Sequence, residues 1–285
     1  MNYKTLLMAS AAVLFSSQAM AQDLTGAFSV PGKGQIMSET SMAMSRAKTK
    51  FNVSASLPGA TIPIYSAQRT DDGLTAGELI EYGITDKFSV NAGIVNVFDT
   101  GRDQDYNNDH NFEYQVGAKY NTRFDDVLFQ VAGHYNTWNP KDFYGHNTDM
   151  RWQKSLGLDL KAGLDLGNGI TPYIVYSIDS AIDTAHRPLT QSVSAGIHKY
   201  TGKWALDGAI RYEWDKNSKD YTGKNRTETW FDGAADYYLK DNIAIGVYGS
   251  YLIDAHDSTM SYGFISERYH TNFDYSVGLR VKVLF

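Results

Sequence analysis

Apolar and polar residues alternate along the C-terminal end of the chain. From Phe273 to Phe285 every odd position is apolar, whereas the even positions up to Lys282 carry polar residues or glycine. Successive side chains of a β-strand point to opposite faces, so this alternation predicts a strand with one apolar and one polar face. A chain that ends in an aromatic residue on such a strand resembles the C-terminal signal that the assembly machinery of outer-membrane barrels reads.

The same alternation recurs along most of the chain and predicts about twelve strands of roughly 11 residues, the length of a tilted membrane-spanning strand. The predicted strands cover residues 35–46, 74–84, 88–98, 110–121, 127–138, 151–164, 170–180, 189–200, 203–215, 226–239, 243–254 and 272–285.

Short and long gaps between these segments alternate without exception. The short gaps, at 85–87, 122–126, 166–169, 201–202 and 240–242, carry Gly, Asn and Asp, which tolerate tight-turn dihedral angles. The long gaps are 47–73, 99–109, 139–150, 181–188, 216–225 and 255–271. This parity is typical of a barrel with short periplasmic turns and long outer loops. We therefore predict an all-β fold, a transmembrane antiparallel up-and-down β-barrel with both termini in the periplasm.

Segment 47–73 leaves the strand count open. Phe51, Val53 and Ala55 alternate with polar residues, and so do Ile62 and Ile64. The segment is a long first loop, a piece folded into the lumen, or an extra hairpin that raises the count to fourteen.

The N-terminus predicts export. Lys4 precedes a short apolar run at 6–15, and Ala19-Met20-Ala21 is a small-x-small cleavage site. We expect residues 1–21 to be a signal peptide and 22–285 to form one barrel domain. The sequence contains no cysteine, so a closed ladder of hydrogen bonds has to hold the fold. The 20 tyrosines suit two aromatic belts at the membrane interfaces.

Charged residues on the polar faces predict the lumen lining, because charge facing hydrocarbon is costly. These residues are Glu81, Glu113, Lys119, Asp159, Lys161, Lys203, Asp207, Arg211, Glu213, Asp232, Asp236, Arg280 and Lys282. They line a hydrated path or fill the interior as paired charges. Acids interleave with bases, which argues against an anion channel for acidic sugars.

Other chemistry has little support in the sequence. Asp254, His256 and Asp257 could activate water in an outer-membrane hydrolase, although a solvated loop also explains them. The net charge of −6 argues against a nucleic-acid partner. No cofactor and no metal site is predicted. The expected partners are outer-membrane lipid and lipopolysaccharide, the barrel-assembly machinery through the strand ending in Phe285, and a small solute.

The stretch from Glu81 to Val90, EYGITDKFSV, contains a tyrosine-glycine-x-threonine-aspartate turn. It is similar to a hairpin of the outer-membrane transporter family named for the phenol meta-degradation pathway, and the Gly32-Lys33-Gly34 sequence fits that family loosely. The resemblance covers about residues 31–98 and implies transport without naming a substrate. The sequence thus predicts a narrow channel or transporter for small solutes. The alternatives are an Asp/His outer-membrane hydrolase and a non-conducting surface barrel.

Overall fold

The computed structural model describes residues 28–57, 60–99, 110–138, 153–182, 189–216, 227–256, 258–262 and 265–285. The predicted signal peptide and its cleavage site lie outside these ranges. Every regular secondary-structure element in these ranges is a β-strand. No helix in these ranges is long and apolar enough to cross a membrane.

Antiparallel strands form one sheet whose two ends meet. The elements are β1 (Ile36–Leu57), β2 (Ala60–Thr85), β3 (Phe88–Asp99), β4 (His110–Phe124), β5 (Val127–Trp138), β6 (Gln153–Leu164), β7 (Ile170–Ala181), β8 (Leu189–Thr201), β9 (Trp204–Lys216), β10 (Thr227–Lys240), β11 (Ile243–His256), β12 (Ser258–Tyr262) and β13 (Ile265–Leu284). Neighbours in sequence pair throughout, and β1 pairs with β13 to close the ring. The short β12 pairs with β13 alone, so twelve strands form the wall and the predicted twelve-strand antiparallel barrel is confirmed.

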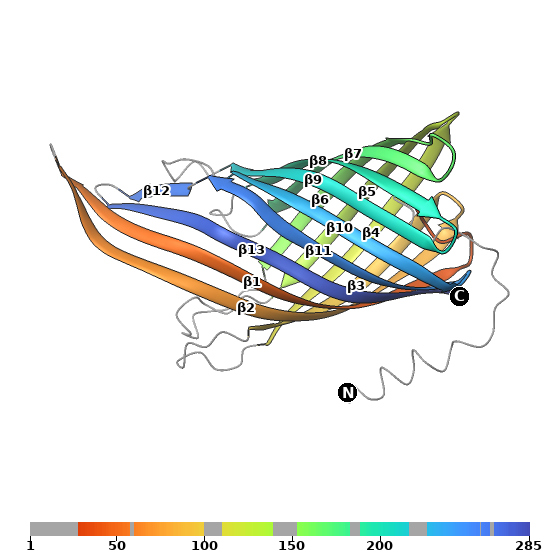
Figure 1. The fold of residues 1–285 in the computed structure, drawn as a ribbon, viewed down its shortest axis with the longest axis horizontal. Helices are drawn as coiled ribbons and strands as arrows, with labels where there is room; N and C mark the ends of the chain where they lie inside the picture. The colour runs from red at the N-terminus through yellow and green to blue at the C-terminus, as the bar shows by residue number, and fades with distance from the viewer. Residues whose placement is uncertain are drawn as a thin grey trace.

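Tight turns join the strands at one end of the barrel, which we call the short-turn end. Asp125 and Asn168 adopt positive φ angles of 50° and 53°, and Gly202 adopts 59°. Aspartate, asparagine and glycine tolerate this left-handed region better than other residues do. The C-terminal strand also ends here, as Figure 1 shows. The opposite end, where for example β3 ends and β4 begins, is called the loop end.

The first hairpin, accompanied by the outer part of β13, extends well beyond the other wall strands at the loop end (Figure 1). β1 and β2 stay paired up to Leu57 and Ala60, with one register shift next to Val53. Segment 47–73 is therefore neither a loop nor an extra pair of wall strands. β13 follows β1 as far as the pair of Ala55 and Ile265. Much of segment 255–271, predicted as a loop, is consequently strand.

The two faces of the wall differ in chemistry. In β6 the side chains of Leu156, Leu158 and Leu160 are exposed on the outside. Between them, Asp159 lies 3.7 Å from the Nδ1 atom of His134, on the inner face. Large apolar side chains are exposed in the same way around the barrel. An apolar outer surface around a polar interior is typical of a membrane-spanning barrel.

Candidate functional site: the barrel interior

Near the short-turn end, bases of the interior are paired with carboxylates. Lys119 Nζ lies 2.7 Å from Glu81, whose side chain is fully buried. Arg280 donates two hydrogen bonds, of 2.8 and 2.6 Å, to the two carboxylate oxygens of Asp236. A bidentate pair fixes both side chains in orientation as well as in distance. These contacts fill part of the interior with neutralised charge.

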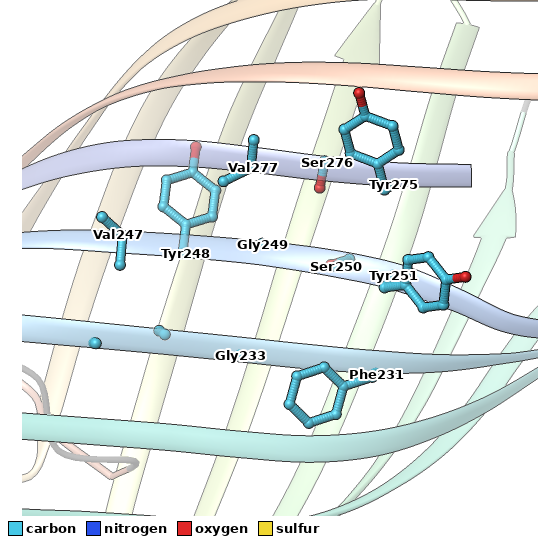
Figure 2. A pocket seen from close by; sticks show the side chains of 12 residues that line it. Phe231, Gly233, Val247, Tyr248, Gly249, Ser250, Tyr251, Tyr275, Ser276 and Val277 are labelled. Atoms are coloured by element: carbon cyan, nitrogen blue, oxygen red, sulfur yellow. The ribbon is translucent and has the colours of Figure 1, made fainter. Parts of the chain in front are cut away.

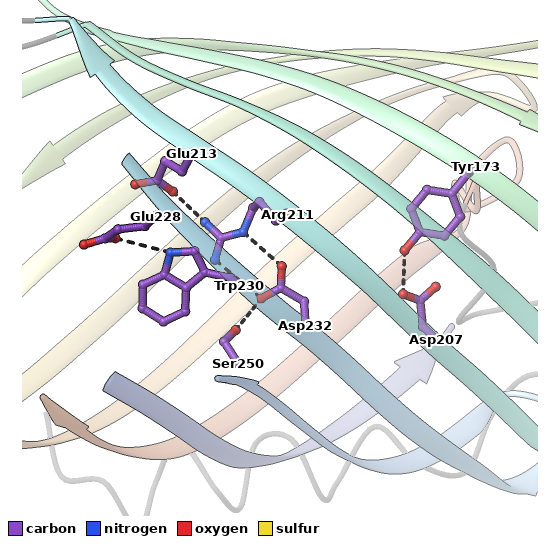
Figure 3. A network of polar contacts seen from close by, with 8 residues as sticks. All are labelled: Tyr173, Asp207, Arg211, Glu213, Glu228, Trp230, Asp232 and Ser250. Carbon is purple, nitrogen blue, oxygen red and sulfur yellow. Dashed lines mark hydrogen bonds and ion pairs between the residues drawn. The ribbon is translucent and has the colours of Figure 1, made fainter. Parts of the chain in front are cut away.

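A second network lies nearer the loop end and is drawn in Figure 3. Arg211 donates to Glu213 through Nη1 at 2.6 Å and to Asp232 through Nε at 2.9 Å. Ser250 Oγ also donates to Asp232, at 2.6 Å. The guanidinium lies 5.3 Å from the ring centroid of Trp230, close enough for a cation–π contact. Residues of three neighbouring strands thus hold Arg211 in one position on the wall.

A third group places carboxylates around one imidazole. His134 Nε2 lies 3.3 Å from Asp179, and His134 Nδ1 lies 3.7 Å from Asp159. Ser155 Oγ donates to Asp179 at 3.3 Å. Glu113 is near enough to interact electrostatically with both His134 and Asp179. The network sits in the interior of β4 to β7.

Lys161 and Asp207 belong to a fourth contact group. Lys161 Nζ lies 4.2 Å from the ring centroid of Tyr173 and 5.0 Å from that of Phe28. The Tyr173 hydroxyl donates to Asp207 at 2.6 Å, as Figure 3 shows. The buried His198 has its Nδ1 atom 3.5 Å from the same carboxylate. The side chains of Lys161, Tyr173, Asp207 and His198 thus form one continuous contact group across β6 to β9.

The predicted lumen residues mostly meet one another in these groups. Lys282 lies 3.5 Å from Glu39 and completes the set at the short-turn end. Lys203 differs, because it is exposed in the turn before β9, with Nζ 5.9 Å from the ring of Tyr237. Tyr237 in turn packs on the exposed Trp204, at 5.0 Å between ring centroids.

Sequence reasoning left Tyr173 and Trp230 out of the lumen set. The signal that could have found them is position parity. Tyr173 has the parity of Asp179 on β7, and Trp230 has that of Asp232 on β10. The predicted lumen set contained charged residues only, so these two aromatic residues were not included.

The segment before β1 enters the barrel at the short-turn end. Gly34 N donates to Gly83 O at 2.8 Å, and Gly83 N donates to Gln35 O at 3.0 Å. Further along, Asn121 Nδ2 donates to the carbonyl oxygen of Phe28, and the Phe28 ring reaches Lys161 on β6. The partners from β2, β4 and β6 have inward parity. Residues 28–35 therefore cross part of the opening, a feature that no periodicity or motif in the sequence predicts.

A groove of about 540 Å³ lies on the outer face of β10, β11 and β13 (Figure 2). The rings of Phe231, Tyr251 and Tyr275 surround Gly233 and Gly249, and the groove forms because glycine has no side chain. Phe231 and Tyr251 are exposed outward, so the groove belongs to the apolar surface and not to the interior path. In the described ranges, no group of three or more His, Asp or Glu side chains is arranged to hold a metal ion.

Comparison with solved structures identifies the architecture. The fold is similar to the COG4313 outer membrane channel from Pseudomonas putida F1, with a TM-score of 0.56 and 12% identity over 91% of this chain and 98% of that one. It is also similar to a Pseudomonas aeruginosa FadL homologue, with a TM-score of 0.50 and 10% identity over 93% and 94% of the two chains. The chain has the fold of outer-membrane barrels. No protein-family model and no curated protein matches the sequence.

Proposed function

We propose that the chain is a narrow outer-membrane channel or transporter for small solutes, with its short-turn end in the periplasm. The observation that carries the proposal is a closed twelve-strand wall that is apolar outside and charged inside. A wall of this size lies between filled eight-strand barrels and open sixteen-strand porins. The two similar solved structures, an outer membrane channel and a FadL homologue, agree with such a role.

The inward segment 28–35 narrows the opening at the short-turn end. It spans from Gly83 on β2 to Lys161 on β6, and Val30 and Pro31 are buried within it. Basic and acidic side chains of the interior are held in ion pairs. A solute that passes along the path therefore meets positive and negative groups in fixed positions on the wall. We assign no charge preference to the solute on this basis.

The proposed role also implies partners for the outer wall and for the C-terminal strand. Phe285 N donates to Ile36 O at 2.8 Å, so the terminal residue helps to seal the barrel, and we propose that the strand ending there is read by the assembly machinery. Lipid and lipopolysaccharide contact the apolar wall. The resemblance to the phenol meta-degradation transporter family stays a prediction.

We propose no enzymatic step. Asp254 and His256 lie 3.4 Å apart, and both side chains are largely exposed at the end of β11. General-base catalysis gains from a partly enclosed group that is positioned against its substrate. Ordinary solvation explains an exposed pair at the rim, and Asp257 lies outside the described residues.

Single-channel recording tests the proposal. Protein comprising residues 22–285, refolded in planar bilayers, should give small, discrete conductance steps and should let small sugars swell liposomes. Gly83→Ala should enlarge the steps, because its Cβ would lie 2.1 Å from Gly32 O and displace residues 28–35. Gly77→Ala, an inward position on the same strand with contacts of 3.3 Å or more, is the control and should resemble the wild type. Folded protein without conductance or swelling would indicate a non-conducting surface barrel.

A further inference from the structure

Basic side chains follow one another on the outer face of β1, above its apolar part. Met44 is 62% exposed on the outside, and the next outward positions of the strand are Arg46, Lys48 and Lys50. β1 and β2 pair without a register shift up to Val53, so the alternation of side chains is unbroken over this stretch. The outward row of Arg46, Lys48 and Lys50 is called the β1 basic row.

The β1 basic row has an excess of positive charge. Asp72 accepts two hydrogen bonds from Arg46, at 2.6 and 2.9 Å, and a guanidinium has further N–H groups for another acceptor. In the described register, neither β2 nor β13 places a carboxylate directly opposite Lys48 or Lys50. The row is therefore a positive patch on the outside of the barrel.

The level of this patch is that of a membrane–water interface. The stretch from Ile36, the first residue of β1, to Arg46 covers roughly 33 Å along the strand. At a tilt of about 40° this is roughly 25 Å of height, the extent of the apolar band of a membrane barrel. Arg46 is paired with Tyr275, which is paired with the exposed Tyr251 on β11. Tyrosines in this position are typical of an aromatic belt at the interface.

The outer groove of Figure 2 begins at the same level. Tyr251 and Tyr275 line it next to the interface, and Gly233 and Gly249, which are paired with each other, leave it open below them. Its volume of about 540 Å³ and its position on the apolar surface suit a hydrocarbon chain. β13 borders both the groove and β1, so the groove lies beside Arg46.

The length of the β1 basic row distinguishes between anionic lipids. Arg46 and Lys50 are separated by roughly 13 Å along the strand, which is more than one phosphate group spans. Lipid A, the membrane anchor of lipopolysaccharide, carries more than one phosphate on a disaccharide, whereas a common phospholipid carries a single phosphate. Arginine binds phosphate through paired N–H groups, and lysine binds it as a point charge. The row thus favours lipopolysaccharide over a phospholipid.

We propose that the β1 basic row and the outer groove form one binding site for lipopolysaccharide. The row binds phosphates of lipid A at the interface, and the groove takes one of its acyl chains. In the orientation of the proposed function the loop end faces the outer leaflet, where lipopolysaccharide lies. The inference rests on that orientation, but not on conductance.

Titration with defined lipids tests the identity of the ligand. Protein comprising residues 22–285 is refolded in detergent, and lipid A, fully dephosphorylated lipid A and phosphatidylglycerol are added separately. Native mass spectrometry should show one retained molecule of lipid A and much weaker retention of the other two lipids. Equal retention of phosphatidylglycerol would overturn the assignment to lipopolysaccharide. Equal retention of the dephosphorylated form would overturn the role of the basic row.

Removal of charge tests the row itself. Lys48→Gln combined with Lys50→Gln leaves the ion pair of Arg46 in place and should weaken lipid A binding on the order of tenfold or more. Lys87→Gln combined with Lys240→Gln is the matched control, because both lysines are exposed at the short-turn end and the net charge changes equally. This control should bind lipid A as the wild type does. Equal weakening of both variants would show that overall charge, and not the row, attracts the lipid.

Filling of the groove gives an independent readout. A Cβ atom at Gly233 would lie 3.2 Å from the Phe231 side chain, so Gly233→Val occupies the groove and should weaken lipid A binding several-fold. Gly208→Val is the matched control. Gly208 is paired with Gly233 on the neighbouring β9, lies outside the groove lining, and has 4.0 Å of space at its Cβ position. Wild-type binding by Gly233→Val would overturn the role of the groove, and heat-modifiable migration controls for folding of both variants.

Conductance recorded on the same samples separates the two proposals. A protein that conducts but retains no lipid A contradicts the binding site alone. A protein that retains lipid A at the basic row without conducting contradicts the channel function alone.

Discussion

At the scale of single residues, neighbouring positions in one strand experience different solvents. Leu158 is 40% exposed on the outer face of β6. Asp159, the next residue, lies 3.7 Å from His134 in the interior. The period of two along a strand is the physical cause, since a shift of one residue moves every side chain to the other face. The same parity places Ile80 outside and Glu81 inside on β2.

Charge tolerance should follow this parity. Leu158→Arg places a cation in the apolar band and should lower the free energy of unfolding by roughly 2–4 kcal/mol. Asp159→Asn should cost much less, because an amide can still hydrogen-bond in the polar interior. Urea titration of the protein folded in phospholipid vesicles measures both, with Leu158→Met as the size-matched control. Equal losses for the two variants would mean that β6 is buried on both faces.

At the scale of the elements, the first hairpin contains two parts with different roles. Up to Arg46 and Asp72 it is part of the barrel wall and pairs with β13 and β3. Above that level, β1 pairs with β2 on one side and with the outer part of β13 on the other. Ser66 and Asn52, joined by a 2.8 Å hydrogen bond, are exposed there. The outer part therefore adds backbone pairing without closing the ring.

Removal of the outer part should leave the barrel folded. In a variant with residues 48–70 replaced by Asn-Gly, a good two-residue hairpin turn, the paired residues Ala47 and Asp71 flank the new turn. The unheated variant should still migrate differently from the heated one on a gel. Deletion of β3 (Phe88–Asp99) is the contrasting control, since it removes a wall strand and should abolish the folded band. Loss of the folded band in the first variant would show that the extension is required for closure.

At the scale of the whole molecule, stability comes from closure of the ring. β1 pairs with β13 from Met37 and Leu284 onward, and Ile36 N donates to Phe285 O at 3.1 Å. A closed barrel satisfies its backbone donors and acceptors without an edge, which matters where no water can replace a missing partner. A barrel lacking one end of this seam has two open edges.

Truncation before Arg280 should therefore prevent assembly. The variant loses the last six residues of the seam, including Leu284, which is fully buried, and the ion pair of Arg280 with Asp236. We expect strong β-structure by circular dichroism and heat-modifiable migration for the full chain, and neither for the truncated chain. Phe285→Leu, which keeps the backbone pairing, should fold in detergent. A folded truncated chain would show that closure does not depend on this seam.

The sequence by itself determined most of the strands and their faces and indicated about twelve of them, with fourteen left open, because a period of two and turn residues such as Asn168 and Gly202 are local properties of the chain. The tertiary structure decided the rest. Pairing of Arg280 with Asp236, or of Tyr173 with Asp207, joins residues far apart in sequence, and depends on the curvature of the closed wall. The entry of Phe28 into the lumen and the height of the first hairpin depend on contacts with distant strands. No local period encodes such contacts.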